Sequence, residues 1–189
     1  MSNNMSNKLS IFTVAVVVSL LTACASPARI DQMTVQGTPA QRIAQTSFTK
    51  NVAVKDVSGG KETNPMWVSN VGNSEFEQAL EGSLANAGML SGGKQLGKYL
   101  LVAHMEKVDQ PLMGFNLTVT ATVNYVLTER ATGKEVMNKR IALPFTAGMG
   151  DAFSAVERLR LANEGAVRTN ITMLIEELSK RGAVDVSMN

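Results

Sequence analysis

Residues 115–127 alternate between apolar and polar side chains, and this is the clearest structural pattern in the sequence. Successive side chains of a strand point to opposite faces of its sheet, so a period of two predicts a long strand with one buried and one wet face. The buried set is Phe115, Leu117, Val119, Ala121, Val123, Tyr125 and Leu127. On the wet face, which meets solvent or a partner, we identify a candidate partner face formed by Asn116, Thr118, Thr120, Thr122 and Asn124.

Three other apolar segments predict the rest of the sheet. Residues 48–57, with closely spaced valines, predict the first strand. Residues 99–108 form a nearly continuous apolar run, which is typical of an interior strand covered at least partly on both faces. Residues 136–145 predict a strand that returns from residues 115–127 through a hairpin turn, with Gly133 where positive φ is required. Pro144 lacks a backbone donor and therefore places the end of this strand at a sheet edge.

Two segments have the spacing of amphipathic helices. The first begins at a capping-box pattern formed by Ser74 and Glu77, and Gly88 is suited to end it. Its inward stripe recurs every three or four residues and consists of Phe76, Leu80, Leu84 and Ala87.

The second helix follows a similar capping-box pattern, formed by Ser154 and Glu157, and we expect Gly182 to end it. Its inward stripe consists of Val156, Leu159, Val167, Ile171, Leu174 and Leu178. Gly165 lies inside this helix, where Gly costs about 1 kcal/mol relative to Ala. It therefore predicts a close contact or a kink.

Together these elements predict an α+β fold. Strand, helix, three strands and helix are typical of a two-layer sandwich, with an antiparallel-rich sheet of about four strands and both helices on one face. The helices would cover the odd-numbered face of residues 115–127 and leave the Thr-rich face open.

The N-terminus has a different pattern. Lys8 precedes thirteen largely apolar residues, 9–21, a run too short to span a bilayer as a helix but suited to the apolar core of a signal peptide. Leu21-Thr22-Ala23-Cys24 follows and contains the only cysteine. This arrangement resembles the lipobox of bacterial lipoproteins, in which the Cys is acylated, with palmitate among the chains, and the peptide is cut just before it. Cys24 is therefore the predicted lipid attachment site and residues 1–23 a removed signal peptide.

An ordinary secretory signal with a chance or buried Cys is the alternative. It would leave one unpaired thiol in an oxidising compartment, whereas a thioether linkage removes that thiol. Several acyl chains also give the stable anchoring that one chain alone does not. Ala25, where an Asp commonly retains such lipoproteins in the inner membrane, implies delivery to the outer membrane.

The mature chain is expected to hold one periplasmic domain. Residues 24–46 are rich in small and polar residues and predict a tether after the lipidated Cys24, although Ile30, Met33, Val35 and Ile43 would let part of it pack as an extended segment. Residues 47–189 form the predicted α+β domain. Removal of 23 residues from the 189-residue chain leaves 166, enough for one sizeable core. The loss of Lys8 lowers the net charge from +2 to +1, which argues against nucleic-acid binding.

Candidate chemistry is sparse. His104 is the only histidine and has no Ser or Cys motif beside it in sequence, so a structural role is favoured over catalysis. Gly148-Met149-Gly150 opens a helix and could receive an anion, but no further glycine or following Lys completes a phosphate loop. The sequence predicts no catalytic residue, no metal ligand set and no cofactor.

Two resemblances bear on function. The lipobox, the helix from Phe76 to Gly88 and the Thr-rich strand are similar to outer-membrane lipoproteins of the YajG type. The stretch 151–165 also resembles bacterial lipoproteins that carry the label UDP-N-acetylglucosamine acyltransferase. The acyltransferases of that name are built from hexapeptide repeats, whereas this chain has no such repeat and two amphipathic helices instead.

Two hypotheses follow. The first is a non-catalytic lipoprotein with a binding or assembly role in the cell envelope, anchored in the outer membrane by its acyl chains, facing the periplasm and binding an envelope protein partner. The alternative is an enzyme of lipid or sugar-precursor metabolism, as the acyltransferase label implies.

Overall fold

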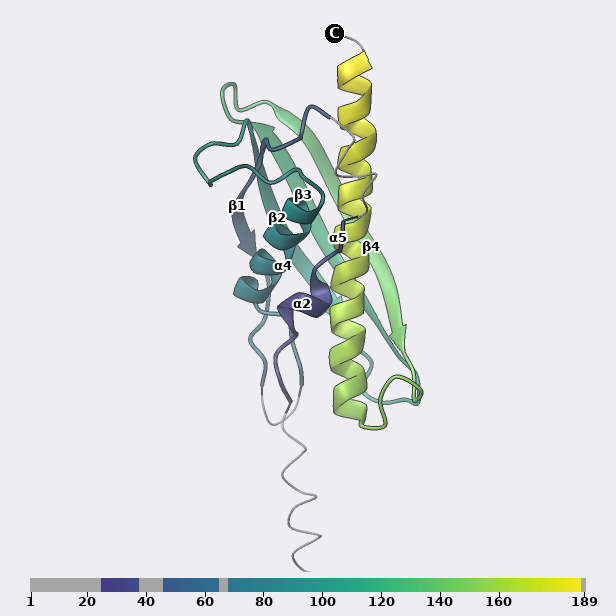
Figure 1. Cartoon of the computed structure of the whole chain (residues 1–189). Coiled ribbons are helices and arrows are strands. Elements are labelled where there is room, and N and C mark those ends of the chain that lie inside the picture. Colours follow the sequence, from purple (N-terminus) through teal and green to yellow (C-terminus); the bar gives the residue numbers. More distant parts are fainter. Residues whose placement is uncertain (1–24, 38–45, 65–67, 188–189) are drawn as a thin grey trace, which may run out of the picture.

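The alternating segment forms β3, Leu117–Glu129, at the centre of the fold. The computed structural model describes residues 25–37, 46–64 and 68–187 (Figure 1). All six odd-numbered residues from Leu117 to Leu127 are buried, as the period of two predicts. The strand starts later than the pattern, because Phe115 and Asn116 lie before it in the loop from β2.

The sheet has four strands in the order β1-β2-β3-β4. β2, Tyr99–Asp109, and β4, Glu135–Ala147, both pair antiparallel with β3. β2 is an interior strand, and β4 is an edge strand, where Pro144 lies within the strand and not at its end. Gly133 has a φ of +70° in the predicted hairpin turn.

The predicted antiparallel-rich sheet is wrong at one pair of strands, and the sheet is mixed. β1, Val52–Ser58, runs parallel to β2. β1 and β2 are parallel because the chain between them passes through the helix α4, Asn73–Asn86. A crossover through a helix brings the chain back in its original direction.

The helix α4 lies where the apolar stripe predicts, but it begins differently. Phe76, Leu80, Leu84 and Ala87 are all buried. Gly72 is the N-cap residue and no side chain caps the helix. Ser74 lies inside the first turn, where its hydroxyl accepts a hydrogen bond from Gln78 Nε2, so the capping-box prediction is wrong. Gly88, with a φ of +72°, follows the helix as expected.

The long helix α5, Ala155–Ser187, packs on β3 and β4. It continues past Gly182, so the predicted end is wrong. Four residues of the predicted stripe are buried, namely Val167, Ile171, Leu174 and Leu178, whereas Val156 and Leu159 are partly exposed. Gly165 marks a close contact, because a Cβ there would lie 2.2 Å from Phe145 Cδ1 on β4.

A third helix comes from the segment predicted as a tether. α2, Ile30–Met33, packs between α4 and α5 and buries Met33 completely (Figure 1). The backbone N–H of Val35 donates to Ser83 Oγ of α4 at 2.8 Å. Residues 25–37 therefore pack on the domain, and they do so through a short helix and not as an extended segment. The three helices of the described residues lie on one face of the sheet (Figure 1).

Candidate functional surface

The opposite face of the sheet, which no described helix covers, is a candidate functional surface. We call it the open face. It is formed by the even-numbered residues of β3 and β4 with their neighbours on β2. Thr118 and Thr146, directly paired across β3 and β4, share a hydrogen bond of 2.8 Å between their hydroxyl oxygens. Further along, Leu100, Val102 and Val126 lie half-buried, so the open face is polar at one end and more apolar at the other.

Thr122 differs from the rest of the predicted partner face because only 4% of it is exposed. An ion pair explains this burial. Arg140 on β4 donates from Nε to Glu106 on β2 at 2.7 Å, so the two side chains must reach across β3 between them. Glu106 lies at an irregularity in the register between β2 and β3, next to Lys107, which is the β2 residue paired with Thr122. The ion pair therefore covers the centre of the open face.

The predicted partner face is thus divided by the structure. Thr118, Thr120 and Asn124 lie on the open face with at least partial exposure. Thr122 lies on the same face but is covered. Asn116 is not in the strand at all; it is exposed in the loop before β3, close to Gly148.

His104 has a partner that sequence reasoning missed. It is exposed on β2, and its Nδ1 lies 3.0 Å from Ser58 Oγ on β1. The pair is created by the parallel register of β1 and β2, which sets Ser58 beside His104 although they are 46 residues apart in sequence. A correct prediction of the parallel pairing would have found it.

On the helix-covered face, buried polar groups of the sheet form hydrogen bonds with Asn170 of α5. The Tyr125 hydroxyl donates to Asn170 Oδ1 at 2.9 Å, and Asn170 Nδ2 donates to the carbonyls of Ala121 and Ile141. Burial raises the pKa of the Tyr125 hydroxyl, so it remains a neutral donor. Asn170 therefore fixes α5 to both β3 and β4.

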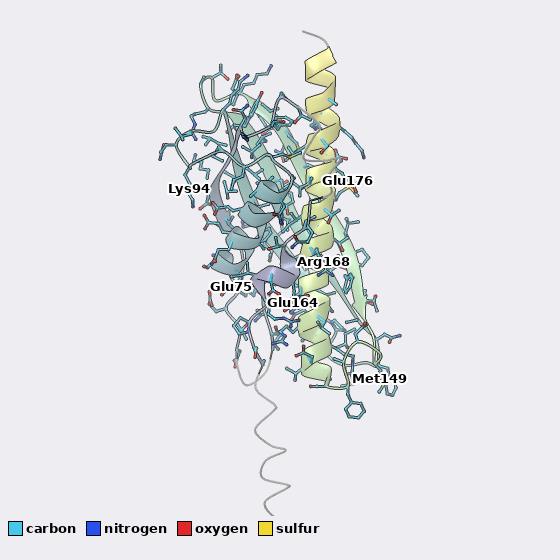
Figure 2. The ribbon with its side chains drawn as sticks, viewed as in Figure 1. Glu75, Lys94, Met149, Glu164, Arg168 and Glu176 are labelled. Atoms are coloured by element: carbon cyan, nitrogen blue, oxygen red, sulfur yellow. The ribbon has the colours of Figure 1, made fainter. Side chains whose placement is uncertain are left out.

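The N-terminal segment is held by a buried carboxylate. Glu164 on α5 is 1% exposed and accepts hydrogen bonds from the backbone N–H, Nε and Nη2 of Arg29 at 2.8 to 3.0 Å. The hydrogen bond to Glu164 raises the pKa of the Arg29 guanidinium, against the opposing effect of its desolvation. Figure 2 shows Glu164 and Arg168 where α2 meets α5, and Arg168 Nη1 donates to the carbonyl of Gln32. These groups bind the segment; none of them is free for a substrate.

The glycine loop before α5 does not present an open anion site. The backbone N–H of Gly148 donates to the carboxylate of Asp151 at 2.7 Å, and the N–H of Asp151 returns to the Gly148 carbonyl. The Asp151 carboxylate therefore already occupies the Gly148 N–H, which a bound anion would need.

The predicted lipid attachment site, Cys24, lies outside the described residues. Within the described ranges no helix is long and apolar enough to cross a membrane. Among those same residues, no three His, Cys, Asp or Glu side chains gather as they would around a metal ion.

The fold and surface define a two-layer α+β domain with an open sheet face and a packed N-terminal segment. The structure is similar to that of protein XCC0632 from Xanthomonas campestris, described as a DUF330 protein, with a TM-score of 0.60 and 13% identity over 86% of this chain and 98% of that one. A candidate lipoprotein from Caulobacter crescentus CB15 has a TM-score of 0.50 and 16% identity over 70% of this chain and 91% of that one. At these identities the likeness establishes a shared fold.

No family model matches the sequence, and no curated protein matches it. The resemblances to YajG-type lipoproteins and to proteins labelled acyltransferases are not confirmed by these comparisons.

Proposed function

We propose that this protein is a non-catalytic lipoprotein of the outer membrane, acylated on Cys24 and facing the periplasm, which binds an envelope protein through its open face. The observation that carries the proposal is the open face itself. It exposes Thr118 and leaves Thr120, Asn124, Val102 and Val126 half-buried, with no described element over them. Exposed polar groups next to a partly apolar region are suited to a protein interface.

The anchor is supported by sequence and comparison. The lipobox Leu21 to Cys24 follows an apolar run of signal-peptide length, and one structural neighbour is described as a candidate lipoprotein. Ala25 and Ala28, shortly after Cys24, are buried on the domain, so acylation of Cys24 would hold the domain close to the membrane.

The anchor is tested by mass spectrometry of the mature N-terminus. We expect a diacylglycerol thioether on Cys24 and an acylated amine, and we expect Cys24→Ser to remove both. Fractionation should place the protein with outer-membrane markers, and Ala25→Asp should shift it toward the inner membrane. An unmodified Cys24 would end the lipoprotein proposal, whereas an unchanged distribution of Ala25→Asp would end only its sorting part.

The open face is tested by site-specific photocrosslinking in cells. Ala142 is exposed on the open face of β4, and Ala85 is exposed on α4, so the two alanines form a matched pair. A crosslinker at Ala142 should give one discrete adduct, whereas the same crosslinker at Ala85 should give none. Equal adducts from both positions, or none from Ala142, would contradict the binding role of the open face.

The alternative, an enzyme of lipid or sugar-precursor metabolism, has one observation in its favour. The Ser58–His104 hydrogen bond joins a hydroxyl to an imidazole, which is the start of a nucleophile–base arrangement. In the described chain, Glu106 is bound to Arg140 and no acid is seen to orient His104. Loss of function in a stably folded His104→Ala protein would favour this alternative over the binding role.

A further inference from the structure

Exposed apolar side chains gather at one end of the molecule. Six large hydrophobic residues are exposed in the described chain, and five of them lie in two loops, β2–β3 and β4–α5. The five, which we call the apolar tip, are Leu112 (100% exposed), Met113 (87%), Phe115 (78%), Met149 (45%) and Phe153 (89%). Figure 2 shows Met149 at this end, far from Lys94. Such a concentration of exposed apolar groups marks an interaction site.

The two loops of the apolar tip are held together by a buried arginine. Arg158, 5% exposed, donates from Nη1 to the carbonyls of Ala152 and Phe153 and from Nη2 to the carbonyl of Gly114. One guanidinium thus ties the β4–α5 loop to the β2–β3 loop. The bond to Gly114, at 3.4 Å, joins the two loops from which the five apolar side chains are exposed.

The start of the described chain lies at the same end. Ser69 Oγ donates to the Ser26 carbonyl at 2.8 Å, and the Ser69 carbonyl accepts from Gln110 Nε2 at 3.0 Å. Gln110 directly precedes the β2–β3 loop. A cavity of about 190 Å³ is lined by Ser69 together with Leu112 and other tip-loop residues. Figure 1 likewise shows the purple start of the described chain and both loops at its lower end.

The closeness of Ser26 to the apolar tip indicates which surface the tip meets. Cys24 is two residues before Ser26, and two extended residues span about 7 Å. If Cys24 carries acyl chains, as in the proposed function, the membrane surface lies close to Ser26, separated from it by those two residues and the lipid linkage. The tip, joined to Ser26 through Ser69, is then held against the same surface.

We propose that the apolar tip enters the interfacial region of the lipid bilayer that holds the acyl chains of Cys24. The inference rests on the proposed acylation and adds a second membrane contact to it. Leu, Met and Phe side chains are suited to the boundary between headgroups and acyl chains, where they leave water without crossing the bilayer. Two separate contacts, the acyl chains and the tip, fix how the domain is oriented on the membrane.

The test uses the acylated full-length mature protein in vesicles of phosphatidylethanolamine and phosphatidylglycerol. Phe153→Cys is labelled with an environment-sensitive fluorophore; a Cys24 held as a thioether leaves the new cysteine as the only thiol. Leu96→Cys is the matched control, because Leu96 is the sixth exposed large hydrophobic residue, 74% exposed, and lies outside the two tip loops. Leu112→Cys provides a second tip position if labelling at Phe153 lowers the melting temperature.

We expect doxyl-labelled phospholipid to quench most of the emission from Phe153→Cys and none of that from Leu96→Cys. Equal quenching, or no quenching at either position, would overturn the membrane contact while vesicle flotation still shows the anchor intact. A blue shift without lipid quenching that grows with the protein-to-lipid ratio would assign the tip to a second copy of the chain and overturn the proposal as well. Mass spectrometry that finds no acyl chain on Cys24 would overturn both the anchor and the tip contact.

Discussion

Along β3, the two faces of the sheet differ in how their polar groups are satisfied. On the covered face, Asn170 and the Tyr125 hydroxyl share a network in which Asn170 makes three hydrogen bonds, all inside the protein. On the open face, Thr118 bonds only its neighbour Thr146 among described groups, and Arg140 bonds Glu106 with 61% of its side chain exposed. The covered groups have no bonding capacity for a partner, whereas the open groups can exchange their bonds for new ones at small cost.

The difference also separates stability from binding. A buried polar group without a partner costs its full desolvation penalty, so the covered face tolerates little change. Surface substitutions away from special features usually stay within about 0.5 kcal/mol. Variants on the two faces should therefore divide into those that affect the folded state and those that affect only association.

The largest effect is expected from Val119→Asp. Val119 is fully buried on the covered face, and an aspartate there would place an unpaired carboxylate in the core. The cost is several kcal/mol, comparable with the whole stability of a small domain. Urea denaturation followed by circular dichroism should show a largely unfolded protein. A cooperative transition close to that of the wild type would contradict the assignment of this face to the core.

Asn170→Ala should have an intermediate effect. It removes the partner of the Tyr125 hydroxyl and the bonds to the carbonyls of Ala121 and Ile141, so we expect a loss of about 1–3 kcal/mol. The neighbouring Thr169→Ala, at a partly exposed position, is the control and should change the free energy of unfolding little. If the two variants unfold at the same denaturant concentration, Asn170 does not brace α5 against the sheet.

The smallest effect is expected from Thr118→Asp, on the open face directly beside Val119. Thr118 is exposed, and the change removes only its hydroxyl contact with Thr146. The midpoint of thermal unfolding should stay close to that of the wild type. A shift comparable with that of Val119→Asp would show that the open face is packed against something within the folded chain.

Along residues 117–127 the period of two separates these faces, because alternation indicates directly which side chains are buried. It could not report cross-strand neighbours. Thr122 fits the wet face by position, yet the ion pair of Arg140 and Glu106 covers it. That pair joins residues 34 apart in sequence through a register irregularity, which no local pattern encodes.

Other differences also arise from long-range packing. α2 has four residues, too few to show a helical period, and its place is set by contacts with α4 and α5. Gly182 resembles a helix end, but α5 continues through it. The parallel pairing of β1 and β2 was implicit in the order strand, helix, strand, and with it the Ser58–His104 pair. The apolar tip is not predicted from the sequence, because the alternating pattern places Phe115 on the buried face although it is 78% exposed.

The packed N-terminal segment has a mechanical consequence. Any pull applied before Ala25 reaches the domain first through the bonds of Ser26 and Ala28 to Ser69 and Asn70. The load then passes to the three hydrogen bonds between Arg29 and Glu164, and so to α5, the longest element. Because these contacts follow one another along the segment, a pull must break them in turn, and it reaches the sheet through α5, which packs on β3 and β4, and not through a strand at the edge.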